Sequence, residues 1–428
     1  CLNFLFFLIV ANRLATKAGY YDVRFKTGEE GSITIVNDFA ILPDDERYTI
    51  RLMGDEVILW GDLLATVGID GGTARIVFDG SQQQHYTTHG GRLPHLVIEN
   101  MNGVVPLNTT NMAVSVFELN GGEFVAPSGV LDVTYHDYAA ANNLIIKSGN
   151  FIHNNGTVSF MVEAESNSSF AQTAIIEHQL LLNKFLVSGG NSGGSKTHPN
   201  LHYNFNINSN GLLAVARELR IESSDPERKV AVNGGEIETW GDVVFGTGAN
   251  GGSVAIVLSG ANVQNISQVE GVAPTGEWRV DKNGGRVVLA TDLTLVGGSQ
   301  DMVWESGVID LSTNRLVVGR DLLSGSGEQR LAVMMADELV AGCLMIGRNA
   351  ESLEGVVLEM DGPDKGREPL LGQSYTVVST GNPLESELES VMWHNPWRGK
   401  VDYSENEGRD VVVYGIWLVH TGTVVVVR

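Results

Sequence analysis

A stretch of 27 residues that occurs twice constrains the fold of this chain more than any other feature. Residues 54–80 read GDEVILWGDLLATVGIDGGTARIVFDG, and residues 234–260 read GGEIETWGDVVFGTGANGGSVAIVLSG. The two stretches align without a gap at an offset of 180 residues, and 11 of the 27 positions are identical. Self-similarity at a fixed spacing is the signature of a repeat architecture, in which each unit buries its apolar face against its neighbours.

Apolar and polar residues alternate through much of both copies, and glycine-rich or Asp/Asn-rich turns interrupt the alternation. Alternation with a period of two indicates strands with one buried face. The composition agrees, because 51 glycines and only 18% charged residues suit many short strands joined by tight turns. Runs such as GGRVVLATDLTLVGG (284–298) and SGVIDLSTNRLVVG (306–319) recur about every 20 residues.

These patterns predict an all-β fold, a parallel β-helix or β-solenoid of imperfect repeats. We assign residues 19–350 to the solenoid, with an internal duplication (31–133 and 211–311) and a partial copy at 144–187. Residues 351–428 end in strongly apolar, aromatic strands and are predicted to form an atypical β-rich C-terminal capping segment. The alternative is a row of tandem β-sandwiches, which would require antiparallel pairing within each unit.

The first residues are predicted to lie outside the solenoid. Residues 2–10, LNFLFFLIV, form an apolar run that is too short to cross a bilayer as a helix. Small residues follow between Ala15 and Gly19, as in the cleavage region of a secretory leader. We therefore expect residues 1–18 to be the remnant of a signal peptide.

Two features within the repeats call for specific predictions. Trp-Gly-Asp at 60–62 and 240–242 is interpreted as a corner, where tryptophan caps the edge of the core, glycine turns the chain and aspartate bonds the backbone just ahead. Gln172 of the partial copy is expected to play the part of Gln84 and Gln264. Residues 171–187 also fit a helical stripe, but the repeat register favours strands there.

The net charge of −23 limits the classes of partner. A chain this acidic repels the phosphates of nucleic acids and anionic membrane surfaces, so we predict no nucleic-acid partner, and membrane contact only through an anchor or signal peptide. The two cysteines, Cys1 and Cys343, are too few for a disulfide framework or a zinc site.

The succession of motifs resembles the degenerate repeats of large secreted bacterial β-solenoid surface proteins, such as adhesins and autotransporter passengers. The resemblance covers residues 31 to 428, and the segments that carry it are IVFDG (76–80), Gln84, HLVIENMNGVVPL (95–107) and FELNGGEF (117–124), then IVLSG (256–260), Gln264, WRVDKNGGRVVL (278–289) and LTLVGG (293–298). It implies an extracellular or outer-membrane-associated location and a surface that binds rather than catalyses.

Several histidines and aspartates are candidate site residues that can also serve the repeat. His85, His89 and His95 lie close in sequence, but His95 follows a Gly-Gly turn, so a converging metal site is not expected. The carboxylates Asp62, Asp132, Asp242 and Asp310 occur in both copies. A catalytic constellation is needed only once, so a repeated residue is expected to serve the scaffold. We predict no catalytic, cofactor-binding or metal-binding residues.

The function expected from the sequence is a non-enzymatic, secreted or cell-surface β-solenoid. It would act as an adhesin-like binding surface for glycans or for matrix and cell-surface proteins, or as a structural stalk. The alternative is a polysaccharide lyase or glycoside hydrolase on a β-helix scaffold. Two or three carboxylates with an Arg or Lys in one outward groove would favour that alternative.

Overall fold

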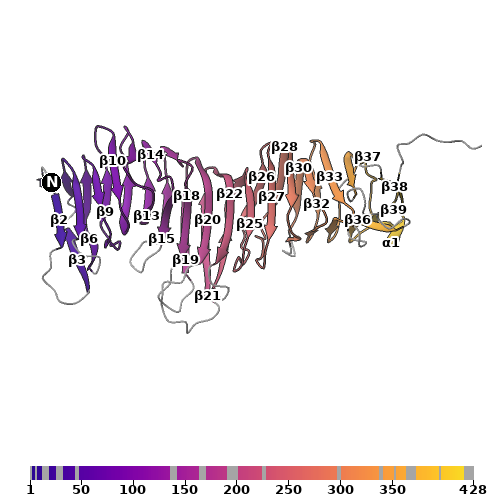
Figure 1. Cartoon of the computed structure of the whole chain (residues 1–428), viewed down its shortest axis with the longest axis horizontal. Coiled ribbons are helices and arrows are strands. Elements are labelled where there is room, and N and C mark those ends of the chain that lie inside the picture. The colour runs from indigo at the N-terminus through magenta and orange to yellow at the C-terminus, as the bar shows by residue number, and fades with distance from the viewer. Residues whose placement is uncertain are drawn as a thin grey trace, which may run out of the picture. The chain divides into compact units, whose positions relative to one another are not determined.

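The chain was analysed as a computed structural model, which describes residues 2–4, 7–11, 19–25, 32–43, 48–134, 142–162, 170–189, 201–223, 228–295, 300–336, 341–350, 353–362, 373–394 and 397–418. These residues form two compact units. Unit 1 comprises Cys1–Ile237 and Gly246–Gly252, and unit 2 comprises Glu238–Phe245 and Ser253–Arg428. Within each unit, the rungs follow one another in chain order along the stack (Figure 1).

Unit 1 is built from short parallel strands that stack rung on rung. Its strands are β1 (Leu2–Phe4), β2 (Phe7–Ala11), β3 (Gly19–Phe25), β4 (Ser32–Ile35), β5 (Phe39–Pro43), β6 (Tyr48–Gly54), β7 (Glu56–Leu59), β8 (Leu63–Ala65), β9 (Arg75–Phe78), β10 (Gln84–Thr88), β11 (Arg92–Ile98), β12 (Val104–Pro106), β13 (Met112–Leu119), β14 (Glu123–Val125), β15 (Val130–Thr134), β16 (Asn142–Ile146), β17 (Asn150–Ile152), β18 (Thr157–Val162), β19 (Phe170–Ile176), β20 (Leu180–Gly189), β21 (Leu201–Ser209), β22 (Leu213–Ser223) and β23 (Arg228–Asn233). β24 (Glu236–Thr239) crosses the boundary between the units.

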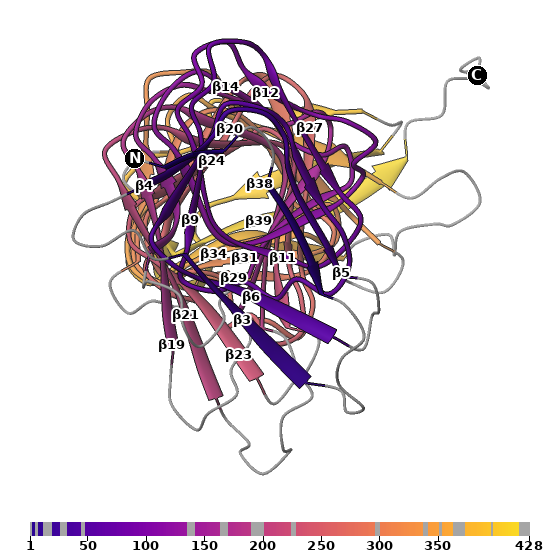
Figure 2. The same cartoon turned by 90° about the vertical axis from the view of Figure 1, so that its left-hand side faces the viewer.

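The register between rungs keeps apolar side chains in columns. In one sheet Val57 pairs with Ile76, and Ile76 with Leu96; all three are buried. Among the described strands a second sheet of seven runs β2-β5-β8-β10-β12-β14-β17. Figure 2 shows the indigo and purple coils of unit 1 winding around a common centre, which these inward side chains fill. Apolar side chains of one rung therefore stack on apolar side chains of the next, as expected for a solenoid.

The duplicated stretch folds into the same glycine-dependent arch in both copies. Gly72 has φ +123° and Gly252 has φ +107°, a region that favours glycine. A Cβ at either position would overlap a carbonyl oxygen of the preceding strand, that of Leu52 or of Val232. The backbone N–H of Leu52 donates to the Gly71 carbonyl (2.9 Å), and that of Val232 donates to the Gly251 carbonyl (3.0 Å). The repeated glycines are thus fixed by close backbone packing.

The partial copy does not reproduce this arch. Gly156 of the partial copy (144–187) does not have a positive φ, and its neighbour Asn155 does (φ 57°). The competing helix at 171–187 is absent from the described residues 170–189, because this segment forms β19 and β20. The strand prediction is confirmed: tertiary register overrides a local pattern that also fits a helix.

The first residues pair as strands in the structure. Leu2 of β1 lies opposite Ile33 of β4, and Phe7 of β2 lies opposite Phe39 of β5. These residues therefore take part in the same parallel pairing as the rungs that follow. The assignment of residues 1–18 to a signal peptide stays a prediction.

Unit 2 continues the parallel rung pattern and ends differently. Its strands are β25 (Asp242–Phe245), β26 (Ala255–Ser259), β27 (Val263–Gln268), β28 (Trp278–Leu289), β29 (Leu293–Leu295), β30 (Met302–Asp310), β31 (Arg315–Val318), β32 (Leu322–Ser324), β33 (Gln329–Met334), β34 (Cys343–Ile346), β35 (Val356–Asp361), β36 (Ser374–Thr380), β37 (Ser390–Trp393), β38 (Trp397–Asp402) and β39 (Asp410–Leu418), with one helical turn, α1 (Glu405–Gly408).

Parallel pairing extends beyond residue 350, where the capping segment was expected to begin. β35 pairs in parallel with β33 and with β37. The change of direction comes later, where β39 pairs antiparallel with β36 and with β38. An antiparallel hairpin at the last rung covers backbone groups that would otherwise form an open sheet edge. Apart from an isolated antiparallel bridge between Met335 and Ala341, the other strand pairs whose register is described are parallel, so the fold is a β-solenoid and not a row of tandem sandwiches.

The arch makes a testable statement about stability. Gly72→Ala should lower the free energy of unfolding by about 3 kcal/mol or more, because it adds both an unfavourable φ and an overlap with the Leu52 carbonyl. Gly103→Ala is the matched control: φ is +96° there, but the nearest atom to a Cβ is 3.8 Å away, so a cost of about 1 kcal/mol is expected. Equal costs in denaturant-unfolding measurements would contradict this account.

Candidate functional site

The repeated Trp-Gly-Asp motif has a structural part in both units, as predicted, though not in the way expected. Asp62 accepts a hydrogen bond from the backbone N–H of His85 (2.7 Å), and Asp242 accepts one from Asn265 (2.8 Å). Each aspartate therefore ties its own corner to the following rung and not to the residues just ahead. A Cβ at Gly61 would overlap the Asn37 backbone, so close packing requires glycine at this position.

The tryptophans do not seal the core. Trp60 is 48% exposed, and the indole N–H of Trp240 donates to Glu238 (2.8 Å). The expectation that this residue caps the core edge is wrong for Trp60, because the corner projects outward from the stacked strands. The motif is thus a scaffold element with an exposed aromatic face in unit 1.

Buried glutamines hold the same corners from inside. The Gln84 side-chain N–H₂ donates to the carbonyls of Leu59 (3.0 Å) and Gly61 (2.5 Å). Gln264 makes the equivalent bonds to Thr239 (2.8 Å) and Gly241 (2.7 Å). Such bonds satisfy carbonyls that the turn removes from the sheet ladder.

The two copies differ in the side chain that donates a hydrogen bond to the glutamine carbonyl oxygen. Asn100 donates to the Gln84 carbonyl oxygen (2.7 Å), whereas in the second copy Lys282 donates to that of Gln264 (2.8 Å) and to the Ser259 carbonyl (2.9 Å). Lys282 is fully buried, and burial lowers its pKa to about 8. A buried ammonium held only by neutral acceptors is a cost that the first copy avoids.

The repeated aspartates Asp132 and Asp310 take ordinary positions on strands. Asp132 lies on β15 opposite Ser159 of β18. Asp310 forms an ion pair with Arg286 (2.7 Å), which also contacts the buried carboxylate of Glu359 (3.1 Å). Burial would raise the pKa of Glu359, but the Arg330 hydrogen bond and the charges of Arg286 and His394 hold it below its usual value.

The three histidines are distributed over different elements. His85 lies on β10, beside Asp62 (Nδ1 to Oδ2, 3.3 Å), and His89 lies in the exposed turn that follows. His95 lies on β11 of the other sheet, where its Nε2 is 2.8 Å from Glu118. Among the described residues no three His, Cys, Asp or Glu side chains gather in a metal-binding group.

Glu118 is the centre of a charged network on the outer face of β13. The hydrogen bond with His95 lowers its pKa to about 2; burial opposes this shift, and Lys147 (2.6 Å) adds to it. Arg75 approaches within 3.7 Å. A carboxylate that is buried, ion-paired and held ionised cannot supply a proton near neutral pH, so this network is structural and does not suit general acid catalysis.

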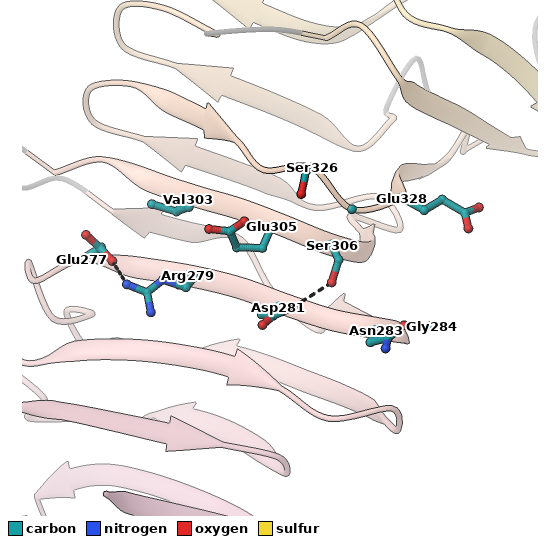
Figure 3. Close-up of a pocket in the computed structure, with 11 residues that line it drawn as sticks. Glu277, Arg279, Asp281, Asn283, Gly284, Val303, Glu305, Ser306, Ser326 and Glu328 are labelled. Atoms are coloured by element: carbon teal, nitrogen blue, oxygen red, sulfur yellow. Dashed lines mark hydrogen bonds and ion pairs between the residues drawn. The ribbon is translucent and has the colours of Figure 1, made fainter. Parts of the chain in front are cut away.

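A groove of about 760 Å³ lies in unit 2 on the outer face of β28, β30 and the turn after β32 (Figure 3). Side chains alternate along β28, so that Arg279 and Asp281 face outward while Trp278 and Val280 enter the core. The residues that line the groove are Glu277, Arg279, Asp281, Asn283, Gly284, Val303, Glu305, Ser306, Ser326, Gly327 and Glu328.

Most of the groove carboxylates already have partners. Glu277 pairs with Arg279 (2.6 Å), and Asp281 accepts from Ser306 (2.9 Å). Glu328 pairs with Arg330, and in Figure 3 its carboxylate points away from Glu305. These partners fix the lining side chains in place before any ligand arrives.

Glu305 stands apart from this pattern. The rung register is Val280 opposite Trp304 and then Asp281 opposite Ser306, so Glu305 is the extra residue of a β-bulge. A bulge re-aims a side chain and is common beside functional sites. Glu305 is half-buried, and among the described residues its carboxylate has no hydrogen-bond or ion-pair partner. Gly325 is needed beside it, because a Cβ there would overlap the carboxylate.

This groove was not singled out from the sequence. None of its residues belongs to the duplicated motif at 234–260, and a search guided by repetition selects scaffold positions. One signal was available: Ser128-Gly129 and Ser306-Gly307 align between the copies, but the residue before them is Pro127 in one copy and Glu305 in the other. A charge that appears in only one copy is the kind of residue a single site requires.

No protein-family profile and no curated protein sequence matches the chain. Among solved structures it is similar to the Haemophilus influenzae Hap adhesin, with 10% sequence identity and a TM-score of 0.25. The alignment covers 96% of this chain and 64% of the Hap chain, so this chain spans less than two thirds of that protein. At this TM-score the likeness adds no argument to the parallel pairing described above. The described residues contain no helix that is long and apolar enough to cross a membrane.

The Glu118 network predicts a specific pH dependence. Its folded pKa lies below the unfolded value, so its contribution to stability is present above about pH 4.5 and is lost as the pH falls toward 2. Glu118→Gln should therefore cost about 2 kcal/mol at pH 7, and the difference from the unaltered protein should shrink steadily below pH 4.5. A difference that stays constant between pH 7 and pH 3 in chemical unfolding would show that the network is not electrostatic.

Lys282 predicts a second rise of stability with pH, in an alkaline window. Its folded pKa of about 8 lies below the unfolded value, so the unfolded chain binds more protons between about pH 8 and pH 10. Relative to Lys282→Met, the unaltered protein should gain about 1–2 kcal/mol of stability across that window. Comparing the two proteins cancels the titration of other groups. If the stabilities of the two proteins changed equally with pH, the Lys282 ammonium would not be desolvated.

Proposed function

We propose that this chain is a secreted or cell-surface β-solenoid whose unit 2 presents a ligand-binding groove, as an adhesin-like surface. The observation that carries the proposal is the pre-ordered groove with the unpartnered carboxylate of Glu305 on a β-bulge. Polar side chains held by neighbours leave one group free to meet a ligand. That arrangement favours binding over a purely structural stalk, which would need no such hollow.

The charge of the groove points to the chemistry of its ligand. Four carboxylates line it, from Glu277, Asp281, Glu305 and Glu328, with a single guanidinium from Arg279. An acidic polysaccharide would be repelled, whereas a neutral or amine-bearing glycan, or a lysine-bearing segment of a matrix protein, would be accommodated. Ser306, Ser326 and Asn283 supply short polar groups of the kind that hydrogen-bond to sugar hydroxyls.

A second candidate function is hydrolysis of a neutral glycan in the same groove. It is favoured by one observation: Asp281 and Glu305 come from neighbouring rungs and face one outward hollow that also contains Arg279. Glycoside hydrolysis uses two carboxylates in such a setting. In this groove Asp281 is held by Ser306, and Glu305 would be the group free to exchange a proton.

The test is a glycan array, probed with the full chain and two groove variants. The unaltered protein should bind to neutral and amino-sugar glycans on the array. Glu305→Gln should weaken this binding about tenfold or more, since a charge-assisted hydrogen bond is lost. Gly325→Ala should act in the same direction, because its methyl group displaces the Glu305 carboxylate. The matched control is Glu99→Gln, which removes the same charge from unit 1.

Two outcomes would contradict the binding proposal. If Glu305→Gln and the unaltered protein bound the glycans equally well, the groove would not be the binding site. Release of reducing ends from the retained glycans by the unaltered protein, abolished in Glu305→Gln, would establish the hydrolase instead.

A further inference from the structure

Three buried polar residues of unit 1 occupy successive rungs and leave hydrogen-bonding atoms unused. They are Ser115 on β13, Asn143 on β16 and Gln172 on β19, with exposed fractions of 2%, 0% and 0%. Within the described structure, the atoms without a partner are Ser115 Oγ, Asn143 Oδ1, and both Nε2 and Oε1 of Gln172. More than nine in ten buried polar groups in proteins are hydrogen-bonded, so four such atoms in one place need an explanation.

The strand register places these residues side by side. Ser115 lies where β13 passes from pairing with β15, at Val114, to pairing with β16, at Phe117. Asn143 is the extra residue of an irregularity between Asn142 and Leu144, and its Nδ2 donates to the Ser115 carbonyl (2.9 Å). Phe117 pairs with Leu144, and Leu144 pairs with Ala174. Ser115, Asn143 and Gln172 are buried residues one or two positions before this row on the same three strands, so they stand in a neighbouring column along the stack.

Gln172 therefore does not play the part expected for it. Gln84 and Gln264 each meet two carbonyls of a Trp-Gly-Asp corner, and no such corner precedes Gln172 in the sequence. Its amide is equally buried but has no turn to bond to. A buried amide without hydrogen-bond partners destabilises the folded state, because its bonds to water in the unfolded chain are not replaced.

We propose that this column is an internal hydration site, in which ordered water molecules bridge Ser115, Asn143 and Gln172 from rung to rung. Adjacent strands lie about 4.8 Å apart, which is close to the span of two hydrogen bonds of about 2.8 Å meeting at one water oxygen. The four unused atoms make no direct bond across this distance, and a single water can bridge it. Buried waters of this kind typically make about three hydrogen bonds each.

The chemistry of the column selects water over an ion. Asn143 Oδ1 and Gln172 Oε1 accept, Gln172 Nε2 donates, and the Ser115 hydroxyl can do either. A cation would be repelled by the amide N–H₂ and finds no carboxylate among these three side chains, while an anion would face two carbonyl oxygens. A neutral molecule that both donates and accepts satisfies every member.

The experiment counts long-lived internal waters in the full chain by oxygen-17 magnetic relaxation dispersion. Gln172→Met, which keeps the length of the side chain and removes its polar atoms, should lose at least one long-lived water. Gln84→Met is the matched control, because its amide bonds directly to carbonyls, and it should lose none. An unchanged water count in Gln172→Met would overturn the proposal.

A second measurement keeps the proposal testable if the variant folds poorly. A crystal structure of the unaltered chain should show water within hydrogen-bond distance of Gln172 and Asn143, and a dry column or an amide bonded directly to protein would overturn the proposal. Stability measurements also distinguish a water-bridged Gln172 from one whose amide has no partner. The denaturant midpoint of Gln172→Met should fall if a water bridge is lost and rise if an orphan amide is removed.

Discussion

Every feature of this molecule depends on one backbone constraint, that each rung must return in parallel and in register with the rung before it. Parallel pairing leaves no room for drift, because a shift of one residue would exchange the buried and exposed faces of a strand. The chain meets this constraint with the glycine arch, in which Gly72 and Gly252 sit where a Cβ would overlap a carbonyl of the preceding strand. The corner aspartates Asp62 and Asp242 then fix the following rung through its backbone N–H.

Repetition explains why the fold could be predicted from the sequence and the site could not. Alternating apolar residues and paired glycines predict parallel rungs, corners and the strands at 171–187, because these features follow from local stereochemistry repeated at a fixed spacing. The groove depends on a β-bulge that places Glu305 between Trp304 and Ser306, and a bulge leaves no periodic trace. The true end of the parallel stack was likewise missed, since β35 and β37 read as atypical strands and yet keep the register.

The two copies of the repeat differ in their chemistry at positions where a residue is replaced in one copy only. The glutamine corner is completed by Asn100 in one copy and by Lys282 in the other, so one is neutral and the other holds a desolvated ammonium. The same logic applies outside, where Pro127 is replaced by Glu305 at the head of an aligned Ser-Gly pair. Inside unit 1, Gln172 keeps the burial of its counterparts without their carbonyl partners. A conserved register therefore supports divergent chemistry at individual rungs.

The register itself can be measured directly by cross-linking in a background where Cys1 and Cys343 are serine. Glu56 and Arg75 lie opposite each other on adjacent rungs, with their side chains in an ion pair on the outer face. Cysteines at these two positions, about 5 Å apart at Cα, should be joined rapidly by dibromobimane, a short thiol cross-linker. Cysteines at 56 and 95, two rungs apart, should react far more slowly. Preferential linkage of 56 to 95, or equal rates for both pairs, would contradict the parallel, in-register stack.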